Sequence, residues 1–394
     1  MKTLILALLV LAMANISSAQ NVNIPDVNFK NALINWGVDT NVDGEISYAE
    51  AEAIYYLNIV ENSISDLTGI EAFINLDTLE ITNTQVTNLD VSGCAALSKL
   101  YCDGNQLISL DVSGCTALKD LRCCCNYLTS LDISNNTLLN CLECHVNQLS
   151  SLDVSNNTAL LFLECGSNWL SSLDVSACTA LTELHCVNND LTVLDVSSNT
   201  DLYFLNCASN QLASLDVTSN TALENLLCAN NQLSTLDVSN NTVLEGLLCG
   251  GNQLTSLDIS NNTALSELSL SNMPTLHKVC VWVVPFPPVG VNVYTTDSPN
   301  VYFTTNCADN IPDDYKENST IHIYPTPSDG IINIKIENIN HAIIEIYNLS
   351  GKFILSKTLN SKFERIDISG FSRGIYIVKV RQDNTVNVGK VVIR

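Results

Sequence analysis

The chain has 394 residues, of which 46% are hydrophobic, and a formal net charge of −24. This length suits two or three domains, and the acidity argues against a nucleic-acid partner, because binding phosphates needs a basic face. The charge is unevenly spread: residues 320–394 carry ten Lys and Arg against six Asp and Glu, whereas residues 20–319 carry six against thirty-five. Such a shift predicts a domain boundary near residue 320.

Residues 1–19 have the pattern of a secretory signal peptide. Lys2 gives the positive start, Leu4 to Ala14 is apolar, and Ala19 suits the small-residue cleavage rule. The apolar run is too short for a membrane anchor. We therefore expect an exported chain that starts at Gln20 and has no transmembrane segment after signal removal.

Residues 20–56 are expected to form a helical N-terminal cap that contains a calcium loop. Residues 39–50 match the EF-hand formula D-x-[DN]-x-[DN]-G-x5-E in full. EF-hands usually work in pairs and only one loop is present, so the alternative is a loop that only caps the repeats. We favour a structural calcium ion, bound by Asp39, Asn41, Asp43, the carbonyl of Glu45, Ser47 and Glu50.

A 21-residue repeat occupies most of residues 57–273. Three columns recur at this period: Asn from Asn105 to Asn252, Cys from Cys102 to Cys249, and Asp from Asp90 to Asp258. Residues 181–191 read LTELHCVNNDL, which fits the leucine-rich-repeat pattern LxxLxLxxNxL with Cys in the third apolar position. Because one unit cannot bury its own apolar face, stacked units predict an α/β-type solenoid with a parallel β-sheet of about eleven strands.

The columns have different expected roles in such a stack. Leu184 and Cys186 lie two residues apart and share the inner face of a strand, whereas His185 points outward. The Asn column is expected to turn inward and pair with loop backbone groups. The Cys column is expected to pack as buried free thiols, and Cys94 and Cys115, on neighbouring rungs of another column, could pair.

Further cysteines crowd two neighbouring units. Cys124 and His145 occupy the same column on adjacent strands, close to Cys125 and Cys141. Metal ligation is one interpretation, but the spacing fits no zinc motif. A local disulfide involving Cys125 or Cys141, or drift within the repeat, is favoured.

The repeats are expected to end in a C-terminal cap at residues 274–308. Cys280 and Cys307 lie outside the repeat columns, and the expected compartment is oxidising. A Cys280–Cys307 disulfide is therefore predicted to close the cap, with two unpaired thiols as the alternative.

Two features of the units carry a resemblance to known proteins. The 21-residue units with LDVS and NNTAL resemble secreted repeat proteins of Bacteroidota, and the segment from Ile59 to Leu76 resembles the 22-residue units of internalins. The resemblance covers most of residues 22–307 and implies a leucine-rich-repeat fold.

After a polar linker at residues 309–319, residues 320–394 alternate short strands with turns and predict a small β-sandwich. This part resembles the C-terminal sorting domain of type IX secretion, although Thr326 stands where the first motif usually has Asn. The resemblance implies contact with the type IX machinery, export across the outer membrane, removal of the domain, and release or surface attachment. The matched residues are Tyr324, Pro325, Pro327, Gly330, Gly374, Tyr376 and Lys390.

No catalytic motif is present in the sequence. None of the five His lies in a triad motif, and there is no HExxH and no phosphate loop, so we expect a protein without enzymatic activity. The outward strand positions predict a mixed charged and aromatic concave face, which suits recognition of a protein or a sugar; solvated variation is the alternative. The predicted face has two columns: Tyr101, Arg122, Glu143, Glu164, His185 and Asn206, and Lys99, Asp120, Cys141, Phe162, Glu183 and Phe204.

The leading hypothesis is a monomeric recognition or adhesion protein, secreted or attached to the outer-membrane surface, that binds a protein partner through the solenoid. The alternatives are a carbohydrate-binding surface protein that aids polysaccharide capture and a structural envelope protein.

Overall fold

The computed structural model describes residues 20–60, 63–307, 321–324, 328, 330–336, 342–348, 352–359, 361, 363–382 and 385–394. The chain divides into two compact units, Met1–Cys307 and Ala308–Arg394, and each is described by itself. The predicted signal peptide and the predicted linker at residues 309–319 lie outside the described residues.

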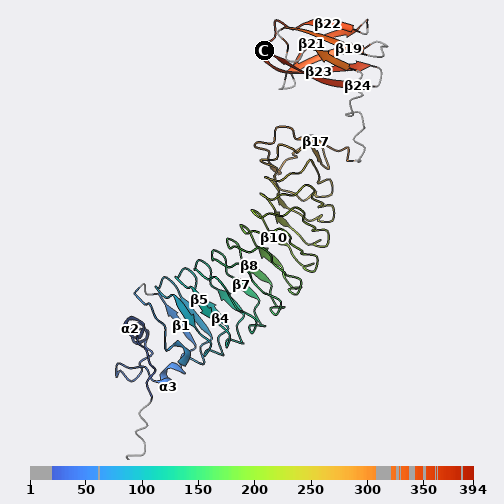
Figure 1. Ribbon diagram of the computed structural model, residues 1–394. Coiled ribbons are helices and arrows are strands. Elements are labelled where there is room, and N and C mark those ends of the chain that lie inside the picture. Colours follow the sequence, from blue (N-terminus) through green and yellow to red (C-terminus); the bar gives the residue numbers. More distant parts are fainter. Residues whose placement is uncertain are drawn as a thin grey trace, which may run out of the picture. The chain divides into compact units, whose positions relative to one another are not determined.

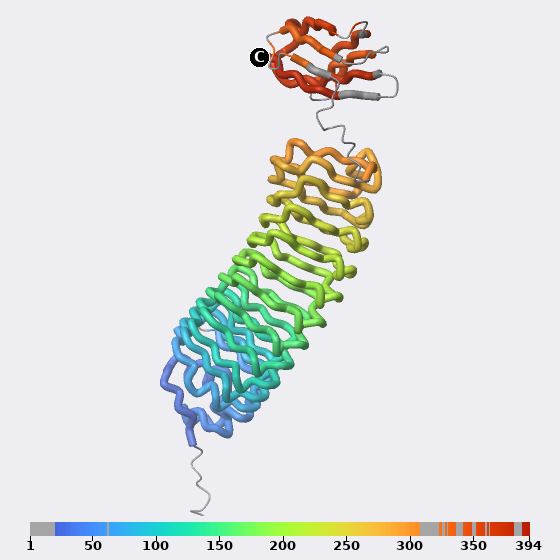
Figure 2. The backbone as a smooth tube through the Cα atoms, turned by 45° about the vertical axis from the view of Figure 1, so that its right-hand side comes forward, coloured from blue at the N-terminus to red at the C-terminus, as the bar shows by residue number. Residues whose placement is uncertain are grey.

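The first unit is a solenoid built on one parallel 12-stranded sheet (Figure 1). The eleven predicted strands all form, and a twelfth, β16, comes from the C-terminal cap. Successive turns of the chain stack side by side along the array (Figure 2), so the predicted solenoid is confirmed. In order across the sheet, the strands are β1 (Tyr56–Ile59), β2 (Thr78–Ile81), β4 (Lys99–Tyr101), β6 (Asp120–Arg122), β7 (Cys141–Glu143), β8 (Phe162–Glu164), β9 (Glu183–His185), β10 (Phe204–Asn206), β11 (Asn225–Leu227), β12 (Gly246–Leu248), β14 (Glu267–Ser269) and β16 (Asn292–Tyr294).

Among the described residues, the segments that return along the other side of each turn form strands only near the two ends of the array. Strand β3 (Asn88–Asp90) pairs with β5 (Ser109–Asp111). Strand β15 (Lys278–Cys280) lies between β13 (Ser256–Asp258) and β17 (Tyr302–Thr304). Strand β15, which belongs to the C-terminal cap, therefore lies in this second sheet and not in the 12-stranded one.

The core follows the repeat columns. Leu184 and Cys186 are fully buried, as are their counterparts along the array. The Asn column turns inward as predicted: Asn189 donates to the carbonyls of Cys165 and Cys186 at 3.1 and 3.2 Å, and accepts from the N–H of Leu170 at 3.0 Å. Each column Asn thus links one turn to the previous one through its side chain.

The N-terminal cap closes the first turn of the solenoid. Helix α2 (Val27–Trp36) begins after Asp26, whose carboxylate accepts from two backbone N–H groups of the first helical turn, and ends at Gly37 with φ +92°. The short helix α3 (Tyr48–Ala51) has a capping box, and η1 (Ile70–Ala72) follows β1. Phe29 of α2 is fully buried in the same core as the first strands, so the cap covers apolar surface that the first turn would otherwise expose.

At the other end, Cys280 and Cys307 form a disulfide, with Cα atoms 5.4 Å apart. In the same cap, the ring centroid of Phe286 lies 5.2 Å from that of Trp282 and 4.8 Å from that of Phe303. The bond and the three rings close the last turns.

The second unit has two antiparallel sheets that share one apolar core. One sheet has β18 (Ile321–Tyr324), β19 (Ile331–Ile336) and β22 (Phe363–Asp367); the other has β21 (Phe353–Leu359), β20 (Ala342–Asn348), β23 (Gly374–Gln382) and β24 (Thr385–Ile393). Ile332 and Ile334 of the first sheet pack with Ile344 and Val378 of the second. This arrangement confirms the predicted small all-β sandwich.

Candidate functional site

The outward side of the 12-stranded sheet between β4 and β10 holds the predicted binding residues, and we call it the sheet face. In each of these three-residue strands the middle leucine is buried while its two neighbours are not, because side chains alternate along a strand. Parallel pairing keeps the outward positions in register, so that Arg122 lies beside Glu143 and Phe162 beside Glu183. The two predicted columns therefore lie on one surface.

Four residues of β4, β6 and β7 form a polar cluster on the sheet face. The hydroxyl of Tyr101 donates to Asp120 at 2.8 Å, and the guanidinium of Arg122 lies 4.8 Å from the ring centroid of Tyr101. Arg122 also contacts Asp120 and Glu143, each at 3.3 Å. Burial and the bond to Asp120 raise the pKa of Tyr101 to about 12. These four side chains form hydrogen bonds and ion pairs mainly with one another, so few of their hydrogen-bond donors remain free for a partner.

Three residues of β8, β9 and β10 form an aromatic cluster, which consists of Phe162, His185 and Phe204. The imidazole of His185 lies between the two phenyl rings, with centroids 5.4 Å from Phe162 and 4.7 Å from Phe204. All three side chains are only partly buried. They present three adjacent aromatic rings on an otherwise polar face.

Carboxylates border the aromatic cluster. Glu183 accepts a hydrogen bond from Tyr203 and lies 3.5 Å from Nε2 of His185. Burial raises the pKa of Glu143 and the charge of Glu164 adds to this, although Arg122 opposes it. The sheet face thus combines an aromatic centre with a negative margin.

The predicted calcium loop adopts a compact conformation before α3. Asp39 accepts from the N–H groups of Asp43 and Gly44, at 3.2 and 2.9 Å, and Asn41 accepts from that of Asp43. Gly44 has φ +81°, a conformation that glycine adopts without strain. These contacts turn side-chain oxygens of the first and third loop positions toward the same turn, and the carboxylate of Asp43, at the fifth position, accepts from the N–H of Glu45 at 2.8 Å.

The carboxylate of Glu50 closes the loop. One of its oxygens accepts from the backbone N–H and the hydroxyl of Thr40, and the other from both groups of Ser47. Burial opposes ionisation, but these hydrogen bonds together lower the pKa of Glu50 to about 2. Glu45 pairs its carboxylate with Lys30 of α2, and the loop formula assigns its carbonyl, not its side chain, to an ion. The residues present suit Ca²⁺, a cation that takes carboxylate, amide and carbonyl oxygens.

The extra cysteines do not form the local bridges that the sequence favoured. Cys125 and Cys141 are free thiols, and burial raises the pKa of Cys141 to about 12. Cys94 and Cys115 are also free, and their thiols donate to the carbonyls of Ile70 and Val91 at 3.4 and 3.1 Å. Each finds a backbone acceptor in the preceding turn, so pairing between the two is not needed.

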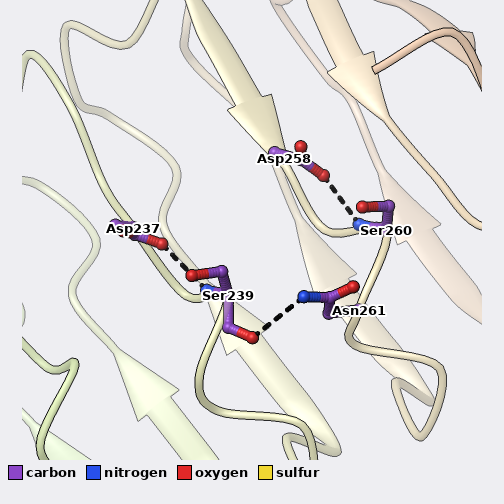
Figure 3. Close-up of a pocket in the computed structure, with 5 residues that line it drawn as sticks. All are labelled: Asp237, Ser239, Asp258, Ser260 and Asn261. Atoms are coloured by element: carbon purple, nitrogen blue, oxygen red, sulfur yellow. Dashed lines mark hydrogen bonds between the residues drawn. The ribbon is translucent and has the colours of Figure 1, made fainter. Parts of the chain in front are cut away.

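A shallow hollow lies between two neighbouring LDVS and LDIS turns (Figure 3). It is lined by Asp237, Ser239, Asp258, Ser260 and Asn261. Each Asp accepts from the N–H of the Ser two residues later at 2.9 Å, and Asn261 donates to the carbonyl of Ser239 at 3.1 Å. The same Asp–Ser turn recurs along the array, so this hollow is a feature of the repeat and not a site that one ligand would single out.

In the sandwich, the residues matched to the sorting motifs lie at a turn, at strand ends and within strands β23 and β24. Gly330 has φ +128°, and a side chain there would meet the Cβ of Ser369 at 2.9 Å. Tyr376 is buried and donates to the carbonyl of Ser372 at 2.9 Å, whereas Tyr324 and Lys390 are exposed. Gly374 begins β23. Pro325 and Pro327 lie outside the described residues.

Two family models match parts of the sequence. The secretion system C-terminal sorting domain matches residues 322–394, and the leucine-rich-repeat domain of the endo-beta-N-acetylglucosaminidase EndoS matches residues 55–157. A search of the curated proteins found no match. In the described part of the chain, no helix is both long and apolar enough to cross a membrane.

Several solved structures are similar. The functional domain of InlJ from Listeria monocytogenes, which includes a cysteine ladder, is 24% identical with a TM-score of 0.55, covering 89% of this chain and 93% of that one. The internalin InlF from the same species is 20% identical with a TM-score of 0.42, covering 71% and 95%. A leucine-rich-repeat protein of Leptospira interrogans is 17% identical with a TM-score of 0.45, covering 66% and 87%. The InlJ similarity shows the fold alone.

Proposed function

Because the chain is a leucine-rich-repeat protein that ends in a type IX secretion sorting domain, we propose that it is an exported recognition or adhesion protein whose sheet face binds a protein partner. The sorting domain implies export, and the leucine-rich-repeat fold is a scaffold for protein interactions. Catalysis is not part of this proposal.

The aromatic cluster is the observation that supports this site most directly. Phe162, His185 and Phe204 stack across three adjacent strands while remaining partly exposed. Aromatic groups gathered at the centre of a surface are typical of the residues that contribute most binding energy in an interface. The bordering carboxylates, Glu164 and Glu183, favour a partner surface that combines apolar groups with Lys or Arg, which would also speed association at low salt.

The test is a binding screen of the exported chain against extracellular proteins, followed by variants of the sheet face. Phe162→Ala and Phe204→Ala should each lower affinity by at least about tenfold, a typical cost for a central aromatic residue. The matched control is Tyr127→Ala, because Tyr127 is an exposed aromatic residue outside the 12-stranded sheet. Equal losses in all three variants, or none, would refute this placement.

A carbohydrate ligand is the second candidate. One matching family model is the leucine-rich-repeat domain of an enzyme named for a glycan-cleaving activity, and aromatic rings beside carboxylates also suit sugars. A glycan array distinguishes the two proposals. Binding of a defined sugar that is lost in Phe204→Ala and little affected by salt would favour polysaccharide capture, whereas a protein partner of this acidic face should dissociate as salt rises.

For the N-terminal loop we propose one structural calcium ion, held by Asp39, Asn41, Asp43, Glu45, Ser47 and Glu50. The convergent oxygens and the positive φ of Gly44 support this proposal. The ion would tie the loop to α3 and so stabilise the cap over the first turn. Calorimetric titration of the calcium-free chain with Ca²⁺ tests the proposal, and the absence of saturable binding would refute it.

A further inference from the structure

A cluster of three metal-ligating side chains lies just beyond the carboxyl ends of β6 and β7, outside the proposed binding and calcium sites. Arg122 of β6 pairs with Glu143 of β7, so Cys124 and His145, two residues further on, are in-register neighbours. Sheet spacing places neighbouring strands about 4.8 Å apart. The pairing of β6 with β7 therefore places Cys124 and His145, which share a column of the repeat, side by side.

The backbone at Cys125 brings a second thiol to the same place. Consecutive side chains of an extended strand point to opposite sides. Cys125, however, has φ +57°, in the left-handed region that turns the chain out of the strand, and its N–H donates to the carbonyl of His145 at 3.0 Å. As a result, the two sulfurs and one imidazole nitrogen all lie within 4.8 Å of one another.

The surroundings of His145 match those of a metal-binding histidine. Nδ1 of His145 is buried, has no hydrogen-bond partner among the described residues, and lies 3.6 Å from the carboxylate of Glu164. Glu143 and Glu164 offer oxygens within 4.8 Å of the imidazole. Metal-bound histidines usually direct their other ring nitrogen to such a carboxylate, which fixes the ring and raises its basicity.

We propose that Cys124, Cys125 and His145 bind a zinc-class cation. Two thiolates and one imidazole are a ligand set that Zn²⁺ favours, with tetrahedral coordination. Water can occupy the fourth position. Cys124 is half-buried and Cys125 exposed, so the ion can enter from solvent. The ion would join two neighbouring turns of the solenoid just beyond the carboxyl ends of β6 and β7.

Cobalt absorption tests the site on the full exported chain. The protein is purified without chelator under anaerobic conditions and mildly reduced. Mass spectrometry checks that the Cys280–Cys307 bond stays intact, because the two reduced thiols lie close to Asp258 and could themselves bind cobalt. Co²⁺ is then added, and the thiolate-to-cobalt charge-transfer band is recorded. The oxygen ligands of the calcium loop do not produce this band. One equivalent of Co²⁺, displaced by Zn²⁺, is the expected result.

Cys124→Ser, Cys125→Ser and His145→Gln should each lower the affinity for cobalt by at least about tenfold. The matched control is Cys141→Ser, which removes a free, partly exposed thiol of β7 that is not in the cluster, and it should leave the affinity unchanged. Circular dichroism checks that each variant folds, and the wild-type band is decisive on its own. The proposal is overturned if reduced wild-type protein shows no thiolate band, if the band survives the loss of Cys124 and Cys125, or if the exported protein carries a Cys124–Cys125 disulfide.

Discussion

The imidazole of His185 stacks on the ring of Phe204, with centroids 4.7 Å apart and planes 20° from parallel, although the two residues belong to different columns of the sheet face. The in-register neighbour of Phe204 on β9 is Glu183. Glu183 instead contacts Tyr203 of the following turn and Nε2 of His185, so the imidazole fills the space between the two phenyl rings. The aromatic centre of the sheet face therefore depends on a diagonal contact.

The Asn column that contains Asn189 and a second inward column that contains Asn199 should differ in how well they tolerate substitution by Cys. Asn189 uses both its amide donor and its acceptor, whereas the buried Oδ1 of Asn199 has no partner among the described residues. Asn199 lies one repeat after Cys178, whose thiol also points to carbonyls of the preceding turns. Asn199→Cys should thus change the free energy of unfolding by less than about 1 kcal/mol, whereas Asn189→Cys should cost about 3 kcal/mol by leaving backbone groups unpaired. Urea unfolding measures both, and equal losses would contradict this account.

The thiols should react in the order of their exposure. Burial raises the pKa of the column residue Cys165 to about 12 and that of Cys186 well above its ordinary value, and both are fully buried. Because the thiolate is the nucleophile, a brief treatment of the metal-free native protein with iodoacetamide should label Cys125 first. The column cysteines should be labelled only after unfolding. Peptide mass spectrometry checks this order, and rapid labelling of Cys186 in folded protein would contradict the structure.

The repeat explains how much of this molecule can be predicted from its sequence. A fixed 21-residue period forces every strand, core leucine and column Asn into register, so the solenoid and the inward role of Asn189 follow from one unit. The features that escaped prediction have different origins. The left-handed φ at Cys125 recurs at the same position of other units, and Gly104, Asn188 and Gly251 in that column could have signalled it, because Gly and Asn adopt this conformation most readily. The stacking of His185 depends on side chains that single units contribute, and the twelfth strand, β16, lies in an irregular cap without the repeat pattern.

Calcium should stabilise the chain through its N-terminal loop. A ligand that binds only the folded state adds stability that grows with its concentration, about 2.7 kcal/mol at one hundred times Kd. Addition of Ca²⁺ to chelator-treated protein should therefore raise the melting temperature of the solenoid by several degrees. Glu50→Gln should abolish this shift, and Glu52→Gln, a change at an exposed carboxylate outside the loop formula, should retain it. If both variants respond like the wild type, Glu50 does not bind the ion.

Acid should destabilise the solenoid through its Asp column. Hydrogen bonds from the hydroxyl and the N–H of the Ser two residues later lower the pKa of Asp153, Asp174 and Asp195 below the ordinary 3.8. A carboxylate whose pKa is lower in the folded state stabilises the fold above the ordinary pKa, and this contribution is lost as pH falls through the folded value. The melting temperature should therefore drop between about pH 5 and about pH 3.

Removing the Ser hydroxyl donors should make the melting temperature less sensitive to acid. The triple variant of Ser155, Ser176 and Ser197 to Ala loses the hydroxyl donors, so the pKa of each Asp moves back toward its ordinary value and the melting temperature should depend less on pH. The matched control is the triple Ala variant of Ser151, Ser172 and Ser214, which are exposed residues two positions before an Asp of the same column. Calorimetry across the pH range measures both. Parallel curves for the two variants would show that the Asp–Ser turns do not cause the acid sensitivity.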